Sequence, residues 1–339
     1  MDYPIEPEHF LQAGIVASMP FRANTMVSQE NVGRSIGGPD HASSTEPRLY
    51  AGKSQDSGPA EGIQLSFTQG EFQVDVISDG YIAVPGDVFA PGVTNEARQD
   101  VLKRLETYGG VVHAPANIPM LRSRSDVILF DVGAGRGYQA TDGLLQNNLE
   151  AFGIDERAIT KIVFTHAHPD HIAATLTDSG GLRFPNATYF VGATEWDFWM
   201  DPDFFTNMPA ALHDFGRSAQ RDLAAIEHRM VLLRNGDDVV SGIRAVGTPG
   251  HTPGHLSFEI SGGDGLLITA DAATSEVVAF EHPDWKFGYD VDAELAIKSR
   301  KRLLDQAAHD RSKLLGFHWR YPGVGFAQAT GGAYRFIPA

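Results

Sequence analysis

Short apolar runs that alternate with helical segments dominate the chain after about residue 63. Residues 125–130 form a compact run typical of a β-strand, and the glycines in residues 131–135 let the backbone turn tightly after it. Residues 144–152 have helical spacing, and residues 159–164 form the next apolar run. This alternation of strand, turn and helix predicts an α/β fold built in layers.

The remaining elements are predicted from the same patterns. Residues 67–77 and 81–84 have the composition of strands, and the segment Ser78-Asp79-Gly80 between them predicts a β-hairpin. Helical content is expected at residues 87–107 and 293–308. Further strands are expected at residues 188–191, 230–233, 243–246, 256–260 and 265–269.

The N-terminal part of the chain differs in composition from the rest. Residues 24–62 are rich in Ser, Gly, Pro, Asn and charged residues and have no sustained apolar period. We therefore divide the chain into an N-terminal extension or arm, residues 1–62, and one large domain, residues 63–339. An arm without its own core is expected to pack on the body or to reach a second subunit, which favours a homodimer.

Charge and cysteine content exclude several classes of protein. The 339 residues include 27 basic and 43 acidic ones, and the formal net charge of −16 argues against a nucleic-acid partner. A neutral or weakly polar small molecule fits this balance better. Because the chain has no cysteine, neither a thiolate ligand nor a cysteine nucleophile is available.

Two features of the sequence bear on the compartment. The apolar stretch at residues 10–21 follows acidic residues instead of a basic segment, so we do not interpret it as a signal peptide. No segment has the roughly 18 uncharged apolar residues of a membrane span, and no membrane partner is expected. A cytoplasmic protein is favoured, and a periplasmic one stays open.

Four metal-binding side chains lie within six residues, directly after the apolar run that ends at Phe164. His166 and His168 are two apart in extended chain, so their side chains project to one face. Pro169 suits the first turn of a helix, which would bring Asp170 and His171 round toward the same point. The segment could therefore serve two metal ions.

Three more candidates each follow an apolar run. His251 lies in a loop fixed by glycine and proline, which presents a side chain rigidly. Asp271 ends the run at residues 266–270, where a buried carboxylate needs a partner charge or a metal. His318 follows the run at residues 314–317.

These motifs, in this order, resemble the metallo-β-lactamase superfamily over most of the chain after Gly62. The resemblance implies a four-layer αβ/βα sandwich with two mixed β-sheets packed face to face. It also implies that Asp271 bridges two metal ions and that His255 lies beside the ligands without binding metal. Asp131 is expected to hold the neighbouring loop or a ligand, because metal sites generally require outer partners that orient their ligands. The implied ligands of one ion are His166, His168 and His251, and those of the other are Asp170, His171 and His318.

Within the superfamily, the chain resembles most the methyl parathion hydrolase-like group. The resemblance rests on Asp197-Phe198-Trp199, on Pro322-Gly323-Val324-Gly325 and on the tail Tyr334-Arg335-Phe336-Ile337-Pro338. It departs at Phe317-His318-Trp319-Arg320, where a small residue would normally precede the last histidine. The predicted substrate contacts are aromatic: Trp199, Tyr138, Trp319 and Phe198.

The donor set defines a reaction class. Nitrogen and carboxylate donors without sulfur suit Zn²⁺, and Mn²⁺, Co²⁺ or Fe²⁺ are also compatible. Two such ions can share a hydroxide and polarise the substrate, so no amino-acid nucleophile is needed. Asp170 is the candidate to orient or deprotonate the attacking water, because a carboxylate offers more than one acceptor site.

We therefore expect a dinuclear metal-dependent hydrolase of a small neutral electrophile, with an organophosphate triester or aryl ester as the main interpretation. A lactonase of the acyl-homoserine lactone type and a hydrolytic dehalogenase of electron-poor aryl chlorides are alternatives with the same centre. An iron-dependent oxidoreductase is an alternative of another class. A non-catalytic metal-binding protein is a third, which predicts the loss of one or more ligands.

The expected chemistry depends on two carboxylates. Asp170→Ala is predicted to lower hydrolytic activity by roughly 100-fold or more, because a positioned acid–base group contributes at least that factor. Asp271→Ala is also predicted to lower activity, because it removes the carboxylate that the resemblance places between the two metal ions. Activity assays together with circular dichroism would show whether activity falls while the fold is retained. Full activity in either variant would contradict the role given to that carboxylate.

Overall fold

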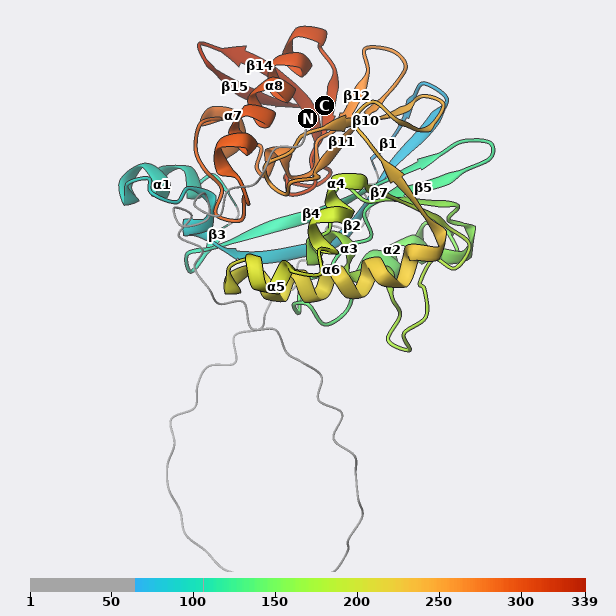
Figure 1. Cartoon of the computed structure of the whole chain (residues 1–339). Coiled ribbons are helices and arrows are strands. Elements are labelled where there is room, and N and C mark those ends of the chain that lie inside the picture. The colour runs from blue at the N-terminus through green and yellow to red at the C-terminus, as the bar shows by residue number, and fades with distance from the viewer. Residues whose placement is uncertain (1–64, 106) are drawn as a thin grey trace, which may run out of the picture. The chain divides into compact units, whose positions relative to one another are not determined.

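Two mixed β-sheets packed face to face form the centre of the computed structural model, which describes residues 65–105 and 107–339 (Figure 1). The order in the first sheet is β1 (Ser66–Gln69), β2 (Phe72–Pro85), β4 (Val111–Arg122), β5 (Val127–Phe130), β6 (Lys161–Val163), β7 (Thr188–Gly192) and β8 (Met230–Leu233), with β3 (Thr107–Tyr108) on β4. The order in the second is β15 (Ala333–Pro338), β14 (Val324–Thr330), β13 (Lys313–Leu315), β12 (Leu266–Ile268), β11 (Leu256–Ile260), β10 (Ile243–Gly247) and β9 (Asp238–Val240).

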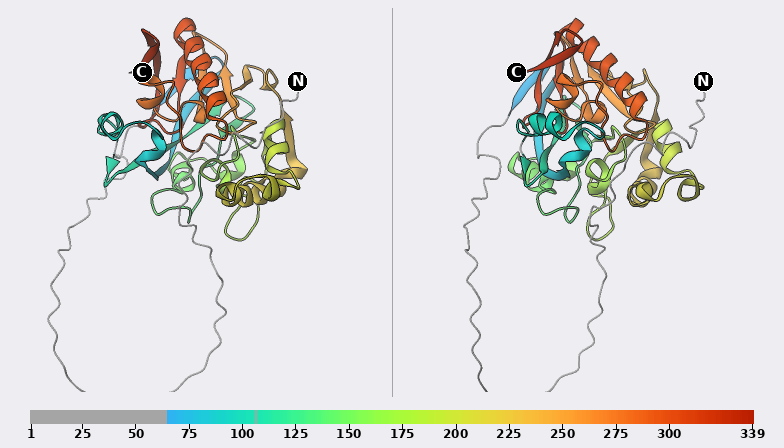
Figure 2. Two further views of the ribbon diagram at one scale, coloured as in Figure 1. Left: turned by 60° about the vertical axis from the view of Figure 1, so that its left-hand side comes forward. Right: turned by 90° about the vertical axis from the view of Figure 1, so that its left-hand side faces the viewer.

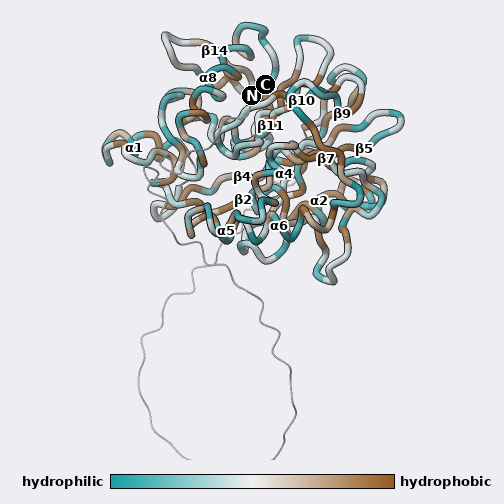
Figure 3. Tube along the Cα trace, in the orientation of Figure 1, coloured by the Kyte–Doolittle hydropathy of each residue, from teal (hydrophilic) through white to brown (hydrophobic). Residues whose placement is uncertain are grey.

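Large apolar side chains from both sheets fill the space between them. Phe130 of β5 and Phe258 of β11 are fully buried, and their ring centroids lie 5.1 Å apart. Figure 3 shows hydrophobic stretches along the central strands and hydrophilic ones in the peripheral loops. The hydrophobic effect therefore holds the two sheets together, as expected for inner faces about 10 Å apart.

Helices cover the two outer faces (Figures 1 and 2). On the first sheet pack α2 (Leu145–Ala151), α4 (Ala193–Trp199) and α6 (His213–Ile226). On the second pack α7 (Val278–Glu281) and α8 (Ala293–Asp310). This arrangement confirms the four-layer αβ/βα sandwich.

The predicted hairpin at Asp79-Gly80 is wrong. β2 runs without interruption from Phe72 to Pro85, and its register against β4 shifts between Ser78 and Tyr81, so that Asp79 and Gly80 form a bulge. The reason is long-range: the buried Asp79 carboxylate accepts the N–H groups of Ala134 at 3.0 Å and Leu145 at 2.7 Å. The turn lies instead between β1 and β2, at Gly70 with φ of 57°.

β4 is a central strand that the sequence did not reveal, because it contains Pro115 and Pro119. The backbone N–H of Asn117, between them, points away from β2 and donates to the carbonyl of Phe317 at 2.9 Å. Side chains and N–H groups two residues apart point the same way in a strand, so both proline nitrogens also face away from β2. The long β2–β4 ladder therefore loses no hydrogen bond to them.

The other differences concern length and coverage. The helical content expected at residues 87–107 shortens to α1 (Asn95–Leu102) and a 3₁₀ turn at Gly86–Phe89. None of the described helices is both long and apolar enough to span a bilayer. The N-terminal arm, residues 1–62, lies outside the described residues, and the homodimer that it suggested stays a prediction.

Gly133 provides a test of how the loop after β5 is built. It has φ of +79°, and an added Cβ would lie 2.2 Å from Oδ2 of Asp79. Gly153 has a similar φ of +72° with nothing within 4 Å. Gly153→Ala should lower the free energy of unfolding by about 1–2 kcal/mol because of its left-handed backbone. Gly133→Ala should lower it by about 1–3 kcal/mol more because of the added steric clash.

Denaturant unfolding of both variants checks this difference. Equal losses of stability would contradict the close packing of Gly133 against Asp79.

Candidate metal centre

The histidine-rich segment leaves the first sheet at the end of β6 and turns into α3 (Pro169–Ile172), which begins with proline as expected. His168 precedes that helix in an extended conformation, and Asp170 and His171 follow in its first turn. The ring centroid of His166 lies 4.6 Å from that of His168 and 4.1 Å from that of His171. All four candidate residues are buried.

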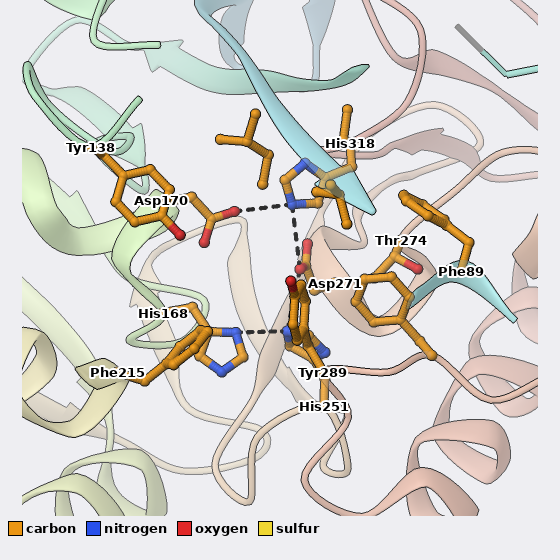
Figure 4. A pocket seen from close by; sticks show the side chains of 14 residues that line it. Phe89, Tyr138, His168, Asp170, Phe215, His251, Asp271, Thr274, Tyr289 and His318 are labelled. Carbon is orange, nitrogen blue, oxygen red and sulfur yellow. Dashed lines mark hydrogen bonds and ion pairs between the residues drawn. The ribbon is translucent and has the colours of Figure 1, made fainter. Parts of the chain in front are cut away.

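The second sheet brings the other three candidates to the same place (Figure 4). Nε2 of His251 lies 2.9 Å from Nδ1 of His168 and 3.3 Å from Oδ2 of Asp271. Nε2 of His318 lies 3.2 Å from Oδ2 of Asp170 and 3.5 Å from Oδ2 of Asp271. Asp271 thus lies between the two implied groups of ligands, as a shared carboxylate would.

The donor atoms fit metal ions on two grounds. Three groups each offer one donor atom per residue, with all atoms of a group within 4.8 Å of one another: His166, His168 and His251; Asp170, His171 and His318; and His166, His171 and Asp271. In addition, several buried polar atoms of the cluster have no hydrogen-bond partner, namely Nε2 of His166, His168 and His171 and Oδ1 of Asp271. Buried polar atoms are normally satisfied, so their convergence indicates cation binding. Imidazole and carboxylate donors suit zinc and do not distinguish it from Mn²⁺, Co²⁺ or Fe²⁺.

The electrostatics of the cluster also favour a bound cation. Burial, reinforced by neighbouring imidazoles, lowers the pKa of His166 and His168 well below the usual value, which keeps them in the neutral form that binds metal. Burial opposes the charge of His318, but Asp271 and Asp170 outweigh it and raise its pKa to about 10. The two carboxylates therefore favour positive charge in the space between them.

Three ring nitrogens that face away from the centre have fixed partners. Nδ1 of His171 lies 2.8 Å from Oδ2 of Asp131, and Nδ1 of His251 lies 3.0 Å from Oδ1 of Asp290. Nδ1 of His318 lies 2.8 Å from the carbonyl of Pro115 in β4. Each partner directs the opposite nitrogen, Nε2, toward the centre.

Asp131 holds more than one group. Its carboxylate also accepts the backbone N–H and the hydroxyl of Thr165, both at 2.8 Å. It does so from a left-handed backbone with φ of 65°, a conformation rare for residues other than glycine. Asp131 thus lies where a residue that orients ligands would be needed.

His255 has a different environment from His251, although both belong to the same loop. Its Nδ1 lies 2.8 Å from Oγ1 of Thr248, and its Nε2 accepts the backbone N–H of Asp271 at 3.2 Å. Burial, with a further contribution from His251, lowers its pKa to about 3, so the ring is neutral. Both ring nitrogens are occupied, so His255 offers no free donor atom to the cluster.

The turn that carries His318 is clamped by β4. The side-chain amide of Asn117 donates to the carbonyls of Gly316 at 3.1 Å and Trp319 at 2.7 Å. The first sheet therefore holds the last candidate ligand of the second.

A pocket opens above the cluster (Figure 4). Its apolar lining includes Ile82, Val84, Phe89, Phe215 and Phe287. Its polar lining beyond the cluster comprises Tyr138, Thr274 and Tyr289. Tyr138 therefore lines the pocket, and its contact with substrate stays a prediction.

The other three predicted substrate contacts do not line the pocket. Trp199 and Trp319 are fully buried; Trp199 lies behind His168, and the indole N–H of Trp319 donates to the carbonyl of Ala273 at 2.7 Å. Phe198 packs against Trp199 beneath the first sheet. The prediction that these residues contact substrate is corrected: they support the site from within the core. Arg320 lines a neighbouring groove of about 340 Å³ that His318 also borders.

The sequence fits a known family over this part of the chain. The model of the metallo-beta-lactamase superfamily matches residues 114–318, which include all seven candidate ligands. The chain belongs to the metallo-beta-lactamase superfamily.

Members of this superfamily that resemble the chain include lactonases. N-acyl homoserine lactonase AttM of Azorhizobium caulinodans is 32% identical over 130 residues, which are 37% of this chain and 45% of AttM. The chain therefore spans less than half the length of that relative. N-acyl homoserine lactonase AiiA of Bacillus thuringiensis subsp. kurstaki is 28% identical over 220 residues, or 58% of this chain and 78% of AiiA.

Two solved structures agree with the fold along most of their length. AidC, a dizinc quorum-quenching lactonase in complex with N-hexanoyl-L-homoserine, has a TM-score of 0.75 and 30% identity, covering 81% of this chain and 97% of AidC. The hydrolase AbOPH of the beta lactamase superfamily has a TM-score of 0.76 and 26% identity, with the same two coverages of 81% and 97%. These similarities favour lactonase relatives and do not single out a methyl parathion hydrolase-like group. The dizinc relative and the clustered donors together support a dinuclear zinc site.

Sequence reasoning missed several residues that border the site. Asp290 and Asn117 act on ligands distant in the chain, and no local motif marks them. Tyr289 borders the pocket, and no sequence motif marks it either.

The two histidines of the second loop give a matched test of the donor set. His251→Ala should lose one of the two zinc ions, because it removes a donor atom from the three-histidine group. His255→Ala should retain both, because His255 offers no donor atom to the cluster.

Zinc analysis after dialysis would measure the difference. Equal zinc content in the two variants would contradict this assignment of donors.

Proposed function

We propose that the chain is a dinuclear zinc hydrolase that opens the ring of N-acyl homoserine lactones. The observation that carries the proposal is the convergence of seven buried donor residues, with Asp271 between two groups. Five of the seven line the floor of a partly apolar pocket: His168, Asp170, His251, Asp271 and His318. The similarity to AidC, over 97% of that lactonase at 30% identity, supports the substrate class.

The pocket chemistry agrees with such a substrate. An acyl homoserine lactone is neutral and has an apolar tail beside a polar ring. The apolar lining of Ile82, Val84 and Phe215 suits the tail, and the donors at the floor suit the ring. A chain with a net charge of −16 would disfavour an anionic substrate.

Bound zinc would supply Lewis-acid polarisation of the lactone carbonyl and would lower the pKa of a water molecule to near 7. The proposed task of Asp170 is to accept the proton of the attacking water and to pass it to the ring oxygen as the ester bond breaks. Burial would raise the pKa of Asp170, but His171 and then His318 outweigh it and lower the pKa to about 2. The carboxylate is therefore ionised at neutral pH.

Two phenols face this reaction centre. Burial, and then the charge of Asp170, raises the pKa of Tyr289 to about 12 and that of Tyr138 well above its usual value. Both groups stay protonated at neutral pH. We propose that they donate hydrogen bonds to substrate oxygens at the mouth of the pocket.

Cleavage of aryl esters or phosphotriesters is a second candidate function for the same centre. It is favoured by the aromatic lining of Phe89, Phe215 and Phe287, which suits a flat leaving group. The carboxylate and zinc chemistry would be the same for both classes of substrate.

A substrate panel distinguishes the candidates. Zinc-loaded protein should open N-acyl homoserine lactones with a higher kcat/KM than it shows for aryl esters or methyl parathion-type esters. Compared at excess zinc, Asp170→Asn should lower kcat for the lactone by roughly 10²–10⁴-fold, because the amide cannot accept the proton. Because Asp170 is also a candidate metal ligand, the zinc content of the variant is measured alongside its activity.

Preferential cleavage of aryl or phosphotriester substrates would instead favour the second candidate. Release of chloride from an electron-poor aryl chloride, without cleavage of any lactone, aryl ester or phosphotriester, would overturn both. An absence of turnover with every ester and lactone, in protein holding both zinc ions, would reject hydrolysis of these classes.

A further inference from the structure

Glu195 is a buried carboxylate beneath the metal centre that has no place in the chemistry proposed above. It lies in the first turn of α4, and only 1% of its surface is exposed. It has no ion pair with a basic residue in the described part of the chain, so hydrogen bonds must compensate its burial. The identity of its donors shows what this carboxylate holds.

Each carboxylate oxygen of Glu195 accepts two hydrogen bonds. Oε1 accepts the backbone N–H of Ala167 at 2.9 Å and the indole N–H of Trp199 at 2.6 Å. Oε2 accepts the hydroxyl of Thr252 at 2.6 Å and the backbone N–H of Gly254 at 3.1 Å.

These donors connect two distant segments of the chain. Ala167 stands between His166 and His168, and Thr252 directly follows His251. The three histidines of one candidate metal group are therefore all next to residues that Glu195 binds. Across this bridge, Nε2 of His251 and Nδ1 of His168 lie 2.9 Å apart.

The loop and the helix approach each other closely at this bridge. An added Cβ on Gly254 would lie 2.0 Å from the backbone nitrogen of Glu195, so only glycine fits there. One further backbone bond, from the N–H of Leu256 to the carbonyl of Thr165 at 2.9 Å, joins the same two segments. The bond between Leu256 and Thr165 joins the ends of the strands. Glu195 instead binds within the two loops that carry the histidines.

The second candidate group is held by other residues. His171 is positioned by Asp131, and His318 by Pro115 and by the clamp of Asn117. None of the hydrogen bonds of Glu195 reaches these partners. A change at Glu195 should thus affect the two groups unequally.

We propose that Glu195 is a positioning residue that sets the zinc affinity of the three-histidine group by holding the loops of His168 and His251 side by side. This inference rests on the proposed dinuclear zinc centre. It gives Glu195 no contact with substrate and no proton to transfer.

Glu195→Gln tests the proposal with almost no change in size. A carboxamide has one oxygen and one NH₂ group, so it can accept hydrogen bonds from one loop only. The hydroxyl of Thr252 can turn to accept from the NH₂ group, but the N–H of Gly254 cannot. With the amide in that orientation, the loop of His251 loses part of its anchor.

The affinity of each group can be measured in a background that removes a ligand of the other. In His318→Ala, where the three-histidine group is intact, Glu195→Gln should raise the zinc dissociation constant roughly 10–100-fold, as for other residues that orient metal ligands. In His251→Ala, where the other group is intact, the same change should alter it by less than about threefold. Chelator competition measures both constants.

Asp222→Asn serves as the matched control. Asp222 is also a fully buried carboxylate on a helix of the same face, but its hydrogen bonds go to Arg221 and not to either loop. This variant should leave both zinc dissociation constants unchanged. Glu195→Gln with restored zinc occupancy at excess zinc should recover most of the wild-type kcat, as expected for a residue that acts through the metal.

Thr252 provides a second route if Glu195→Gln does not fold. Thr252→Val removes one of the four hydrogen bonds and should weaken zinc binding in the three-histidine group, whereas Thr252→Ser keeps the hydroxyl and should not. Equal weakening of both groups, or an unchanged dissociation constant in Glu195→Gln and Thr252→Val, would overturn the proposal. Wild-type protein that binds no zinc would instead refute the dinuclear centre itself.

Discussion

The burial of seven ionisable side chains in one cluster is the constraint on which the rest of this structure depends. Removing carboxylates and imidazoles from water is expensive unless opposite charge or a metal compensates it. The cluster gathers at one edge of the sandwich, where strands of both sheets end, and Asp170 and Asp271 face histidines that they drive toward positive charge. Bound cations would satisfy the carboxylates and the unpaired imidazole nitrogens together.

The surrounding fold holds this cluster with backbone conformations that are unfavourable for residues other than glycine. Asp131 and Ala270 have left-handed backbones, and they are two of only three residues other than glycine with positive φ in the described part of the chain. One binds the ring of His171, and the other directly precedes Asp271. Strained conformations at these positions place the donor atoms where relaxed backbones would not.

The sequence predicted features whose residues are close together in the chain, and it failed where the deciding contacts join residues far apart in the chain. The ligands of the first motif are neighbours in the chain, and strand alternation and a proline turn were enough to bring them together. The Asp79-Gly80 signal failed because the carboxylate binds N–H groups more than fifty residues away, at a separation of 55 for Ala134.

Trp199 was misplaced because sequence gives the character of a side chain but not its direction; its indole turns inward to Glu195. Asp290 and Glu195 have no local signal, since their partners belong to other loops.

The position of β4 has a consequence for how the protein unfolds. This strand belongs to the first sheet, yet its Asn117 and Pro115 hold the turn of His318, which belongs to the second. A ligand that binds only the folded form stabilises it according to its concentration relative to its dissociation constant. Zinc held between donors from both sheets would then act as a thermodynamic crosslink between the two halves. With metal the sandwich would unfold as one cooperative unit, and without it the contacts of β4 would be the principal polar link left between the last ligand and the first sheet.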